Sequence, residues 1–306
     1  MDDLLYQRLG IAVNYLAQDF LTRKIGDRIP PISQYQEQLG VSRGTVQNSL
    51  NYLKERGAIT LVSRGHLGTF IENLDYHCLQ ECSFRKELMG AMPLPYSLSY
   101  QGLATALYRS FPSISFNLVY ARGAESRLRL VTTGACQFIV CSRYTAKKAI
   151  EGKQPVEVLM DLGAGSYLSR HVLVMRQPGV QSIQSGMRVA YDRSSLDQKA
   201  LTEMVCKGVP DVQFVELHAY QTVAAIRAGQ IDAGVWNLDE IVESESSDLN
   251  LVSLDGIMDV TAFSSAVIVV QKNDATTSKL LSHCLDGERI RQIQNDVKQG
   301  VIHPDY

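Results

Sequence analysis

The N-terminal region carries apolar residues at steps of three and four, which is the spacing of one face of a helix. This stripe consists of Leu5, Leu9, Ala12, Leu16 and Phe20. It stops before Gly26, and Pro30-Pro31 cannot continue a helix because proline lacks the amide donor. The pattern therefore predicts a first helix that ends by Gly26.

Two further helices are predicted after this one. The apolar spacing indicates a short helix over residues 32–39. Gly40 then permits a turn that a side chain would hinder, and Ser42 is a good N-cap for a third helix that runs to about Arg56. A turn with glycine between two such helices is typical of a helix-turn-helix, whose second helix enters the major groove of DNA.

A β-hairpin is predicted to complete this region. Two apolar runs, residues 58–63 and 67–71, indicate short strands on either side of Arg64-Gly65-His66. Three helices followed by a hairpin form a winged helix-turn-helix. We therefore interpret residues 1–72 as an α+β DNA-binding domain.

The start of the third predicted helix carries side chains that suit DNA. Arg43 can donate to a guanine or a phosphate, while Ser42 and Thr45 suit phosphate oxygens. Gln47 has the amide group that pairs with adenine. The charged residues after Gly40 and before Phe70 are Arg43, Lys54, Arg56 and Arg64 against Glu55. We expect this local positive excess, Arg64 included, to face the phosphate backbone.

Four segments of this region resemble the GntR-type winged-helix regulators. They are Gly26-Asp27-Arg28-Ile29-Pro30 and residues 39–46, 53–57 and 68–71, within a match over roughly residues 4–71. The resemblance implies a homodimer bound to a two-fold symmetric operator in double-stranded DNA. It also implies that the residues facing DNA include Arg28, Arg43, Thr45 and the wing tip Gly65-His66.

The chain departs from that family at two positions. The family usually has a basic residue early in its second helix, where this chain has Ser33 or Gln34. It usually has an arginine two positions after the threonine of the third helix, where this chain has Gln47. Fewer cations release fewer counterions, so we expect weaker and less salt-dependent DNA binding. A domain that keeps this fold without binding DNA stays an alternative.

The larger C-terminal part follows residues 73–90, which we interpret as a linker or bridging segment. It alternates between strand-like and helix-like runs. Strands are predicted at residues 115–120, 137–141, 156–160, 171–175, 188–191, 212–217, 233–236 and 266–270. Helices are predicted at residues 124–133, 146–151, 195–206 and 219–228, and two more close the chain. This alternation predicts an α/β fold of parallel sheets with helices on both faces.

Two connections from helix to strand in this part are alike. Residues 132–134 lead into 135–139, and residues 228–230 lead into 231–235, each with a glycine before an apolar run. They resemble units of the two lobes of type 2 periplasmic-binding-like domains, over roughly residues 91–306. That resemblance implies two α/β lobes that face a cleft. Joined to the GntR-like region, it makes the whole chain similar to the YhfZ family of transcriptional regulators.

Such a fold places ligands at strand ends and helix starts that face the cleft. Hydroxyl and amide donors there suit an anion, Arg143 can bind one through two donors, and Trp236 can form an apolar wall. The expected ligand-binding residues are Ser97, Ser142, Arg143, Asp192, Ser194, Ser195, Trp236 and Asn237. The alternatives are that the serines only cap helices, that Arg143 is a solvated surface charge and that Trp236 belongs to the core.

Composition and charge narrow the possible function classes. The 306 residues suffice for about two domains, and 30 basic against 32 acidic residues give a net charge of -2. This balance excludes a generally basic coat for nucleic acid but is compatible with a local basic patch. No apolar run is long enough to span a membrane, and the start lacks the pattern of a signal peptide, so we expect a cytoplasmic protein with no membrane partner.

Motifs for catalysis and metal binding are absent from the sequence. It has no Gly-x-Ser-x-Gly, no His-Glu-x-x-His and no phosphate-binding loop, so we expect no catalytic residues and no cofactor. The six cysteines lack the two-residue spacing of zinc knuckles and are interpreted as reduced thiols, with no metal site. The favoured hypothesis is a transcriptional regulator that binds DNA and senses a small anionic metabolite. The alternative is a cytoplasmic small-molecule-binding protein or an enzyme with a vestigial DNA-binding domain.

Overall fold

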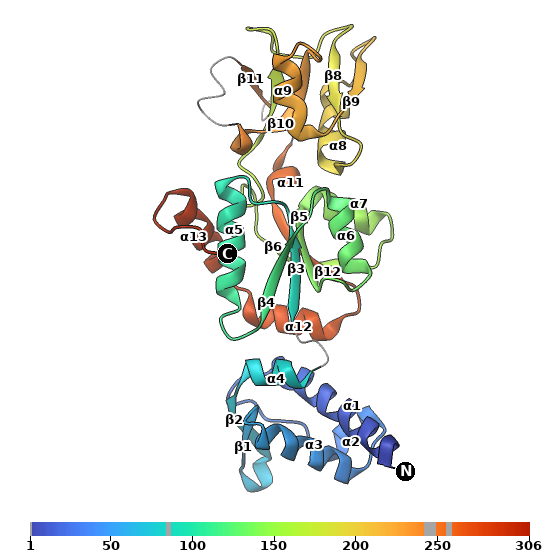
Figure 1. The fold of residues 1–306 in the computed structure, drawn as a ribbon, viewed down its shortest axis with the longest axis vertical. Coiled ribbons are helices and arrows are strands. Elements are labelled where there is room, and N and C mark those ends of the chain that lie inside the picture. The colour runs from blue at the N-terminus through green and yellow to red at the C-terminus, as the bar shows by residue number, and fades with distance from the viewer. Residues whose placement is uncertain (1, 84–86, 242–248, 255–258) are drawn as a thin grey trace. The chain divides into compact units, whose positions relative to one another are not determined.

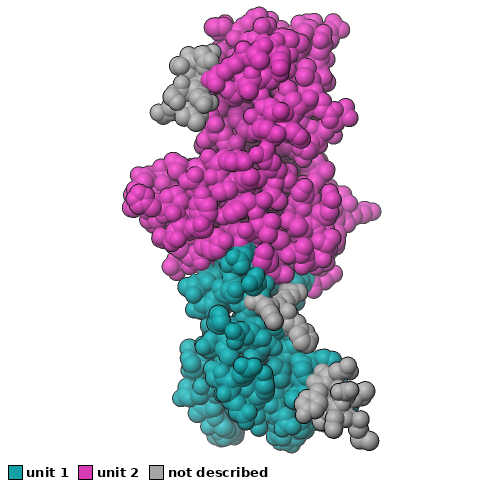
Figure 2. Space-filling model, viewed as in Figure 1, with its two compact units in different colours: residues 1–88, 111–117, 274–284 teal, residues 89–110, 118–273, 285–306 magenta. Residues whose placement is uncertain are grey.

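The chain divides into two compact units, each with a hydrophobic core of its own (Figure 2). The computed structural model describes residues 2–83, 87–241, 249–254 and 259–306. The first unit contains Met1–Leu88, Phe111–Asn117 and Asp274–Cys284. The second unit contains Met89–Ser110, Leu118–Asn273 and Leu285–Tyr306.

Three helices and a hairpin form the N-terminal part of the first unit (Figure 1). The elements are α1 (Asp2–Leu21), α2 (Ile32–Leu39), α3 (Arg43–Glu55), β1 (Ile59–Ser63) and β2 (Thr69–Leu74). Helix α2 ends at Gly40, whose φ of 63° lies in the left-handed region that glycine adopts without strain. Ser42 caps α3 by accepting a hydrogen bond from the amide of Thr45. The predicted helix-turn-helix with a following hairpin is confirmed.

Apolar faces of these elements meet in one core. Leu16 of α1, Leu53 of α3 and Ile71 of β2 are almost completely buried there. Tyr35 of α2 is also buried, and its hydroxyl donates to the carboxylate of Asp19 at 2.6 Å. Because the apolar positions of each helix recur at helical spacing, folding places them all on the face that turns inward.

The segment at residues 73–90 is more than the linker that the sequence suggested. It contains helix α4 (Tyr76–Cys82), in which Leu79 is fully buried in the core of the first unit. The side chain of Gln80 bonds both backbone groups of Ser115, donating at 2.8 Å and accepting at 2.6 Å. The linker interpretation is therefore corrected. Mixed charges obscured a short helix that is held by one apolar side chain and one amide.

A helix from near the C-terminus also belongs to the first unit. Helix α12 spans Ala275–Cys284, and its Leu280 packs against the core of that unit. The Nε2 atom of His283 lies 3.3 Å from the hydroxyl of Tyr76 in α4. The first unit is thus assembled from segments that are far apart in the sequence.

The second unit has two lobes, each built on a sheet of five described strands (Figure 1). The first-lobe sheet has the order β4 (Phe116–Tyr120), β3 (Leu88–Met92), β5 (Phe138–Ser142), β12 (Ala266–Gln271) and β6 (Val156–Asp161). The second-lobe sheet has the order β11 (Asn250–Ser253), β7 (His171–Met175), β10 (Ala233–Asn237), β8 (Arg188–Tyr191) and β9 (Gln213–Glu216). The first lobe includes the helices α5 (Leu98–Ser110), α6 (Ala124–Thr132), α7 (Arg143–Glu151) and α13 (Gly287–Lys298), and the second includes α8 (Leu196–Val205) and α9 (Thr222–Arg227).

Strand β7 shows how helices cover both faces of a sheet. Leu173 and Met175 lie in the core that includes residues of α8, whereas Val172 and Val174 lie in the core that includes residues of α9. Successive side chains of a strand point to opposite faces, so a strand buried on both faces appears in the sequence as a continuous apolar run. The predicted α/β fold with helices on both faces is confirmed.

The direction of the strands differs from the prediction of parallel sheets. Strand β12 pairs antiparallel with β5 and β6, and β7 pairs antiparallel with β10 and β11. Strand β8 pairs parallel with β9 and β10, and β3 pairs parallel with β5. Strands β7 and β12 are the first strands after the chain passes from one lobe to the other. The alternation of helices and strands does not encode the direction in which such a strand enters its new sheet, so both sheets are mixed.

Helices α5 and α13 pack closely in the first lobe. A side chain at Gly102 of α5 would place its Cβ 2.8 Å from the backbone oxygen of Gln294 in α13. The Gln294 amide in turn donates to the backbone oxygens of Ser99 and Ser166, at 2.8 and 2.7 Å. Close approach of the two backbones therefore depends on the absence of a side chain at Gly102.

We expect Gly102→Ala to destabilise the protein by about 1–3 kcal/mol, because the methyl group would push two helix backbones apart. The measurement is urea unfolding followed by circular dichroism. The matched control is Gly287→Ala, at the start of α13, where a Cβ would meet only side-chain atoms at 3.5 Å or more. This control should be neutral or slightly stabilising. Equal losses in both variants would contradict the packing argument.

Candidate functional sites

The start of α3 presents polar side chains to solvent. Ser42, Arg43 and Gln47 are exposed, and Thr45 is half-buried. The Ser42 hydroxyl accepts from the Thr45 amide at 3.2 Å and lies 2.9 Å from the Thr45 hydroxyl. The two hydroxyls are therefore bonded to each other at the start of the helix. The guanidinium of Arg43 and the amide of Gln47 are exposed to solvent.

The hairpin tip carries the remaining predicted DNA-contacting residues. Arg64, Gly65 and His66 are exposed, and the Arg64 guanidinium carbon lies 4.8 Å from the ring centroid of Phe70. Arg28 also reaches the hairpin, since a Cβ on Gly68 would lie 2.6 Å from its Nε atom. The missing side chain of Gly68 thus leaves room for a second cation on the hairpin, which gives a chemical reason for glycine at that position.

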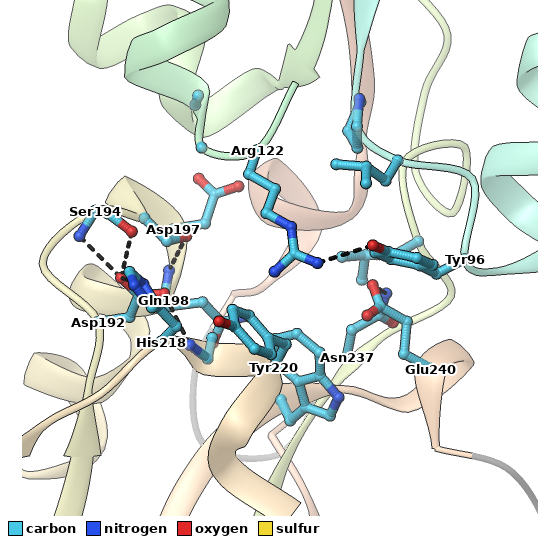
Figure 3. Close-up of a pocket in the computed structure, with 18 of the residues that line it drawn as sticks. Tyr96, Arg122, Asp192, Ser194, Asp197, Gln198, His218, Tyr220, Asn237 and Glu240 are labelled. Atoms are coloured by element: carbon cyan, nitrogen blue, oxygen red, sulfur yellow. Dashed lines mark hydrogen bonds and ion pairs between the residues drawn. The ribbon is translucent and has the colours of Figure 1, made fainter. Parts of the chain in front are cut away.

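A pocket opens within the second unit, with walls from both of its lobes (Figure 3). Its empty space is about 910 Å³, including the part open to solvent, which is a size suited to a small metabolite. The aromatic residues of the lining are Tyr96, Tyr100, Tyr167, Tyr220 and Trp236. The charged carboxylate and guanidinium residues of the lining are Arg122, Arg127, Asp192, Asp197 and Glu240.

The structure brings together some of the predicted ligand-binding residues and not others. Those that line the pocket are Asp192, Ser194, Ser195, Trp236 and Asn237. The predicted residues outside its lining are Ser97, Ser142 and Arg143. Ser97 and Ser142 are buried helix caps, which accept from the amides of Tyr100 and Thr145 at 3.3 and 3.0 Å.

The interpretation of Arg143 as the cation of the pocket is corrected. Its guanidinium donates to both carboxylate oxygens of Asp161, at 2.5 and 2.8 Å. This bond also lowers the pKa of Asp161 from its ordinary value. Position at a strand end specifies which edge of the sheet a residue occupies, but not the partner of its side chain. Here that partner is the acidic residue at the end of β6, which is separated from β5 by β12.

Arg122 is the pocket cation that the sequence analysis missed. Its guanidinium carbon lies 4.4 Å from the ring centroid of Tyr220, and it donates to the hydroxyl of Tyr96 at 2.8 Å (Figure 3). Tyr96 and Arg122 come from the first lobe and Tyr220 from the second. Arg122 follows the predicted strand at residues 115–120 and precedes a predicted helix, so the rule applied to Arg143 would have found it.

The second arginine of the lining has a structural role. Arg127 is almost fully buried, and its three nitrogens donate to the backbone oxygens of Val140 and Ala121 and to the hydroxyl of Tyr167. These bonds span 2.7–3.1 Å. Because its donors are directed at the protein itself, Arg127 supports the pocket wall and contributes positive potential from behind it.

Asp197 connects the two lobes. It lies on α8 of the second lobe and is 8% exposed, and its Oδ1 accepts from the hydroxyls of Ser142 and Thr145 of the first lobe at 2.7 and 3.0 Å. Burial raises the pKa of Asp197 to about 6, although both hydroxyls favour the charged form. A half-neutralised carboxyl near pH 6 is therefore part of the contact that holds the lobes together.

Two buried polar atoms in the pocket lining have no hydrogen-bond partner among the described residues. They are Nδ1 of His171 and Oε1 of Gln198, in side chains that are 2% and 8% exposed. Burial lowers the pKa of His171 to about 4, so the imidazole is neutral at pH 7. Burial also raises the pKa of Glu240, whose Oε1 accepts from the Asn237 amide at 3.2 Å. Buried polar atoms without partners are costly, so their position in a pocket indicates groups ready to bind a ligand.

Fold and sites together define a class: a helix-turn-helix domain joined to a two-lobed α/β domain of the periplasmic-binding-protein type. A family model described as a helix-turn-helix domain matches residues 24–71, and one described as the YhfZ C-terminal domain matches residues 75–306. The chain belongs to the YhfZ family. The finer GntR-type assignment stays a prediction. No helix in the described part of the chain is long and apolar enough to cross a lipid bilayer.

Relatives and solved structures agree with this classification. The chain is 29% identical over 300 residues to the uncharacterized protein YhfZ of Escherichia coli, with 97% of each chain covered. It resembles the crystal structure of YhfZ from Shigella flexneri at 28% identity and a TM-score of 0.61, covering 72% of this chain and 93% of that one. The periplasmic aliphatic sulphonate binding protein SsuA of Escherichia coli matches at 12% identity and a TM-score of 0.54, covering 70% of this chain and 75% of that one, which shows the fold alone.

We expect Asp197→Asn to steepen the dependence of stability on pH between about pH 4 and 6. The raised pKa of Asp197 makes the folded protein bind a proton more tightly than the unfolded chain, so this group lowers stability as pH rises through that window. The lowered pKa of His171 has the opposite sign and raises stability over nearly the same window. Without the Asp197 carboxyl, the rise in stability that His171 causes is no longer offset. The free energy of unfolding of the variant should therefore increase by about 2 kcal/mol across this window.

The measurement is urea unfolding at several pH values, followed by the fluorescence of Trp236, the single tryptophan. At pH 7 the asparagine variant should be at least as stable as the wild type, because its amide oxygen can still accept from both hydroxyls. Asp197→Ala is the control and should lose about 1–3 kcal/mol, since the Ser142 and Thr145 hydroxyls lose their acceptor. An asparagine variant with the pH profile of the wild type would contradict this account of Asp197.

Proposed function

We propose that this chain is a DNA-binding transcriptional regulator that responds to a small molecule. The first unit binds double-stranded DNA through α3 and the hairpin, and the pocket of the second unit binds the effector. The observation that carries the proposal is the exposed start of α3, where Arg43 and Gln47 extend from a helix-turn-helix. A pocket with buried, unpartnered polar atoms supports the effector part.

The proposed DNA contacts divide into two kinds. Arg43 and Gln47 are at the helix start that enters the major groove, and they supply base recognition. Arg64 lies on the hairpin and the side chain of Arg28 reaches it, and both supply contacts to phosphates. Because these cations are few, the salt dependence of binding should be shallow for a protein of this class.

We also propose a homodimer. One helix-turn-helix with so few cations covers a single half-site, and a two-fold symmetric pair would read both halves of an operator and double the electrostatic contribution. An effector that changes the arrangement of two such subunits would need a coupling free energy of only about 1–3 kcal/mol to alter DNA affinity 5- to 150-fold.

Arg43→Ala is expected to weaken binding to a selected operator by about 1–3 kcal/mol, because it removes a base contact. The operator would first be isolated by selection from random DNA, and affinity then measured by fluorescence anisotropy at fixed salt. The matched control is Lys54→Ala, which removes the same charge from the last turn of the same helix and should cost clearly less. Equal losses would mean that Arg43 contributes only general electrostatics, and unchanged binding in the arginine variant would refute its placement.

For the oligomeric state, light scattering of the full chain should give twice the 34.0 kDa of one subunit. DNA protection should then extend over two half-sites. A monomer at micromolar concentration that protects a single half-site would count decisively against the dimer.

A further inference from the structure

Arg122 and Glu240 both line the pocket, and the charge of Arg122 acts on Glu240, but no bond between the two is found in the described part of the chain. Arg122 donates to Tyr96 and stacks on Tyr220, and Glu240 accepts from Asn237. Figure 3 shows the Arg122 guanidinium pointing into the cavity, with Glu240 on one side of it and Gln198 on the other. Arg122 uses one of its donors on protein, and Glu240 accepts one hydrogen bond, so both keep capacity for a ligand.

The other charged groups of the lining are already satisfied by the protein. Asp192 accepts from the amide and hydroxyl of Ser194 and from the amide of Ala219, at 2.6–2.9 Å. Asp197 accepts from two hydroxyls of the opposite lobe, and Arg127 donates to two backbone oxygens and one hydroxyl. Arg122 and Glu240 therefore determine the charge that a ligand must carry.

A purely anionic ligand fits this arrangement poorly. It would gain from Arg122 but would lie close to Glu240, a half-buried carboxylate to which no cation of the described residues is bonded. A purely cationic ligand would gain from Glu240 and would be opposed by Arg122. A molecule that carries both charges offsets the burial of Glu240 and also uses the free donors of Arg122.

The remaining acceptors indicate what kind of cation the ligand carries. Glu240 accepts one hydrogen bond, from Asn237, so the remaining lone pairs of its carboxylate are acceptors for the cationic end of a ligand. Acceptors require N–H or O–H donors, which a primary ammonium has and a quaternary ammonium lacks. The aromatic side chains of Tyr96, Tyr220 and Trp236 complete walls that suit the carbon skeleton between the charged groups.

We propose that the pocket binds a small zwitterion, with its carboxylate or other anionic group at Arg122 and a primary ammonium at Glu240. The assignment rests on the proposed function only in treating this pocket as the effector site. It replaces the small anionic metabolite expected from the sequence with an amino-acid-like molecule of no net charge.

The test uses the full chain and probes of matched length, with binding followed by Trp236 fluorescence and by calorimetry. The zwitterions are glycine, β-alanine, 4-aminobutanoate and L-serine, and the single-charge probes are butanoate and butylamine. Trimethylglycine tests the need for N–H donors. At least one zwitterion should bind about tenfold or more tightly than either single-charge probe, and trimethylglycine should bind more weakly than glycine.

Two variants locate the charges. Glu240→Gln keeps the shape of the side chain and should weaken the best zwitterion by about tenfold or more, while leaving butanoate unchanged or tighter. Arg122→Gln should weaken both the zwitterion and butanoate. The control is Glu157→Gln on the exposed outer part of β6, which should change neither.

The proposal is overturned if butanoate binds as tightly as every zwitterion, if no zwitterion binds at millimolar concentration, or if Glu240→Gln weakens butanoate and zwitterion equally. DNA affinity, measured both without a probe and with each probe, separates this outcome from failure of the regulator proposal. Zwitterion binding in a protein that binds no DNA would leave the ligand class intact and refute the regulator. DNA binding that responds to butanoate but to no zwitterion would support the regulator and refute the zwitterion as its ligand.

Discussion

The pocket of the second unit depends on the contact that a buried carboxylate makes between two lobes. Asp197 belongs to one lobe, and its hydrogen-bond donors, Ser142 and Thr145, belong to the other. Together with the Ser99–Asp239 hydrogen bond and the packing of Arg122 on Tyr220, this contact joins the two walls of the pocket. Burying the Asp197 carboxylate costs free energy, and this cost offsets part of what its hydrogen bonds contribute. A ligand in the pocket can therefore compete with this contact or add to it.

Most of the charged groups at and near the pocket are bonded within the protein. The donors of Arg127 bond to two backbone oxygens and to the hydroxyl of Tyr167. Arg127 therefore stabilises the pocket wall and does not present these donors to a ligand. Arg143 is neutralised by Asp161 outside the pocket. What remains available is Arg122, held between aromatic rings of both lobes. A nearly neutral protein can thus present a specific charge pattern, because most of its charges are already bonded internally.

Much of the fold could be predicted from the sequence, and the failures have physical causes. Helices α2 and α3 were found because each has one apolar face and clear ends. A helix start was expected at Ser97, but the extent of α5 was not, because small and polar residues such as Ser99, Gly102 and Thr105 are buried around its apolar face and obscure it. Ser194, Ser195 and Asn237 line the pocket, as predicted, whereas Ser97 and Ser142 are buried caps outside it. Arg143 was placed wrongly, because the pairing of a long side chain depends on neighbours that the sequence does not bring together.

The first unit is not a contiguous stretch of sequence. Leu79 of α4 fills the core beside α1, and Leu280 of α12 packs against the same core from near the other end of the chain. A fragment ending at residue 72 would leave an apolar face uncovered and prone to aggregate. The helix-turn-helix region therefore completes its core only together with α4 and α12. A transplant of this region into another protein would have to carry both helices to keep that core covered.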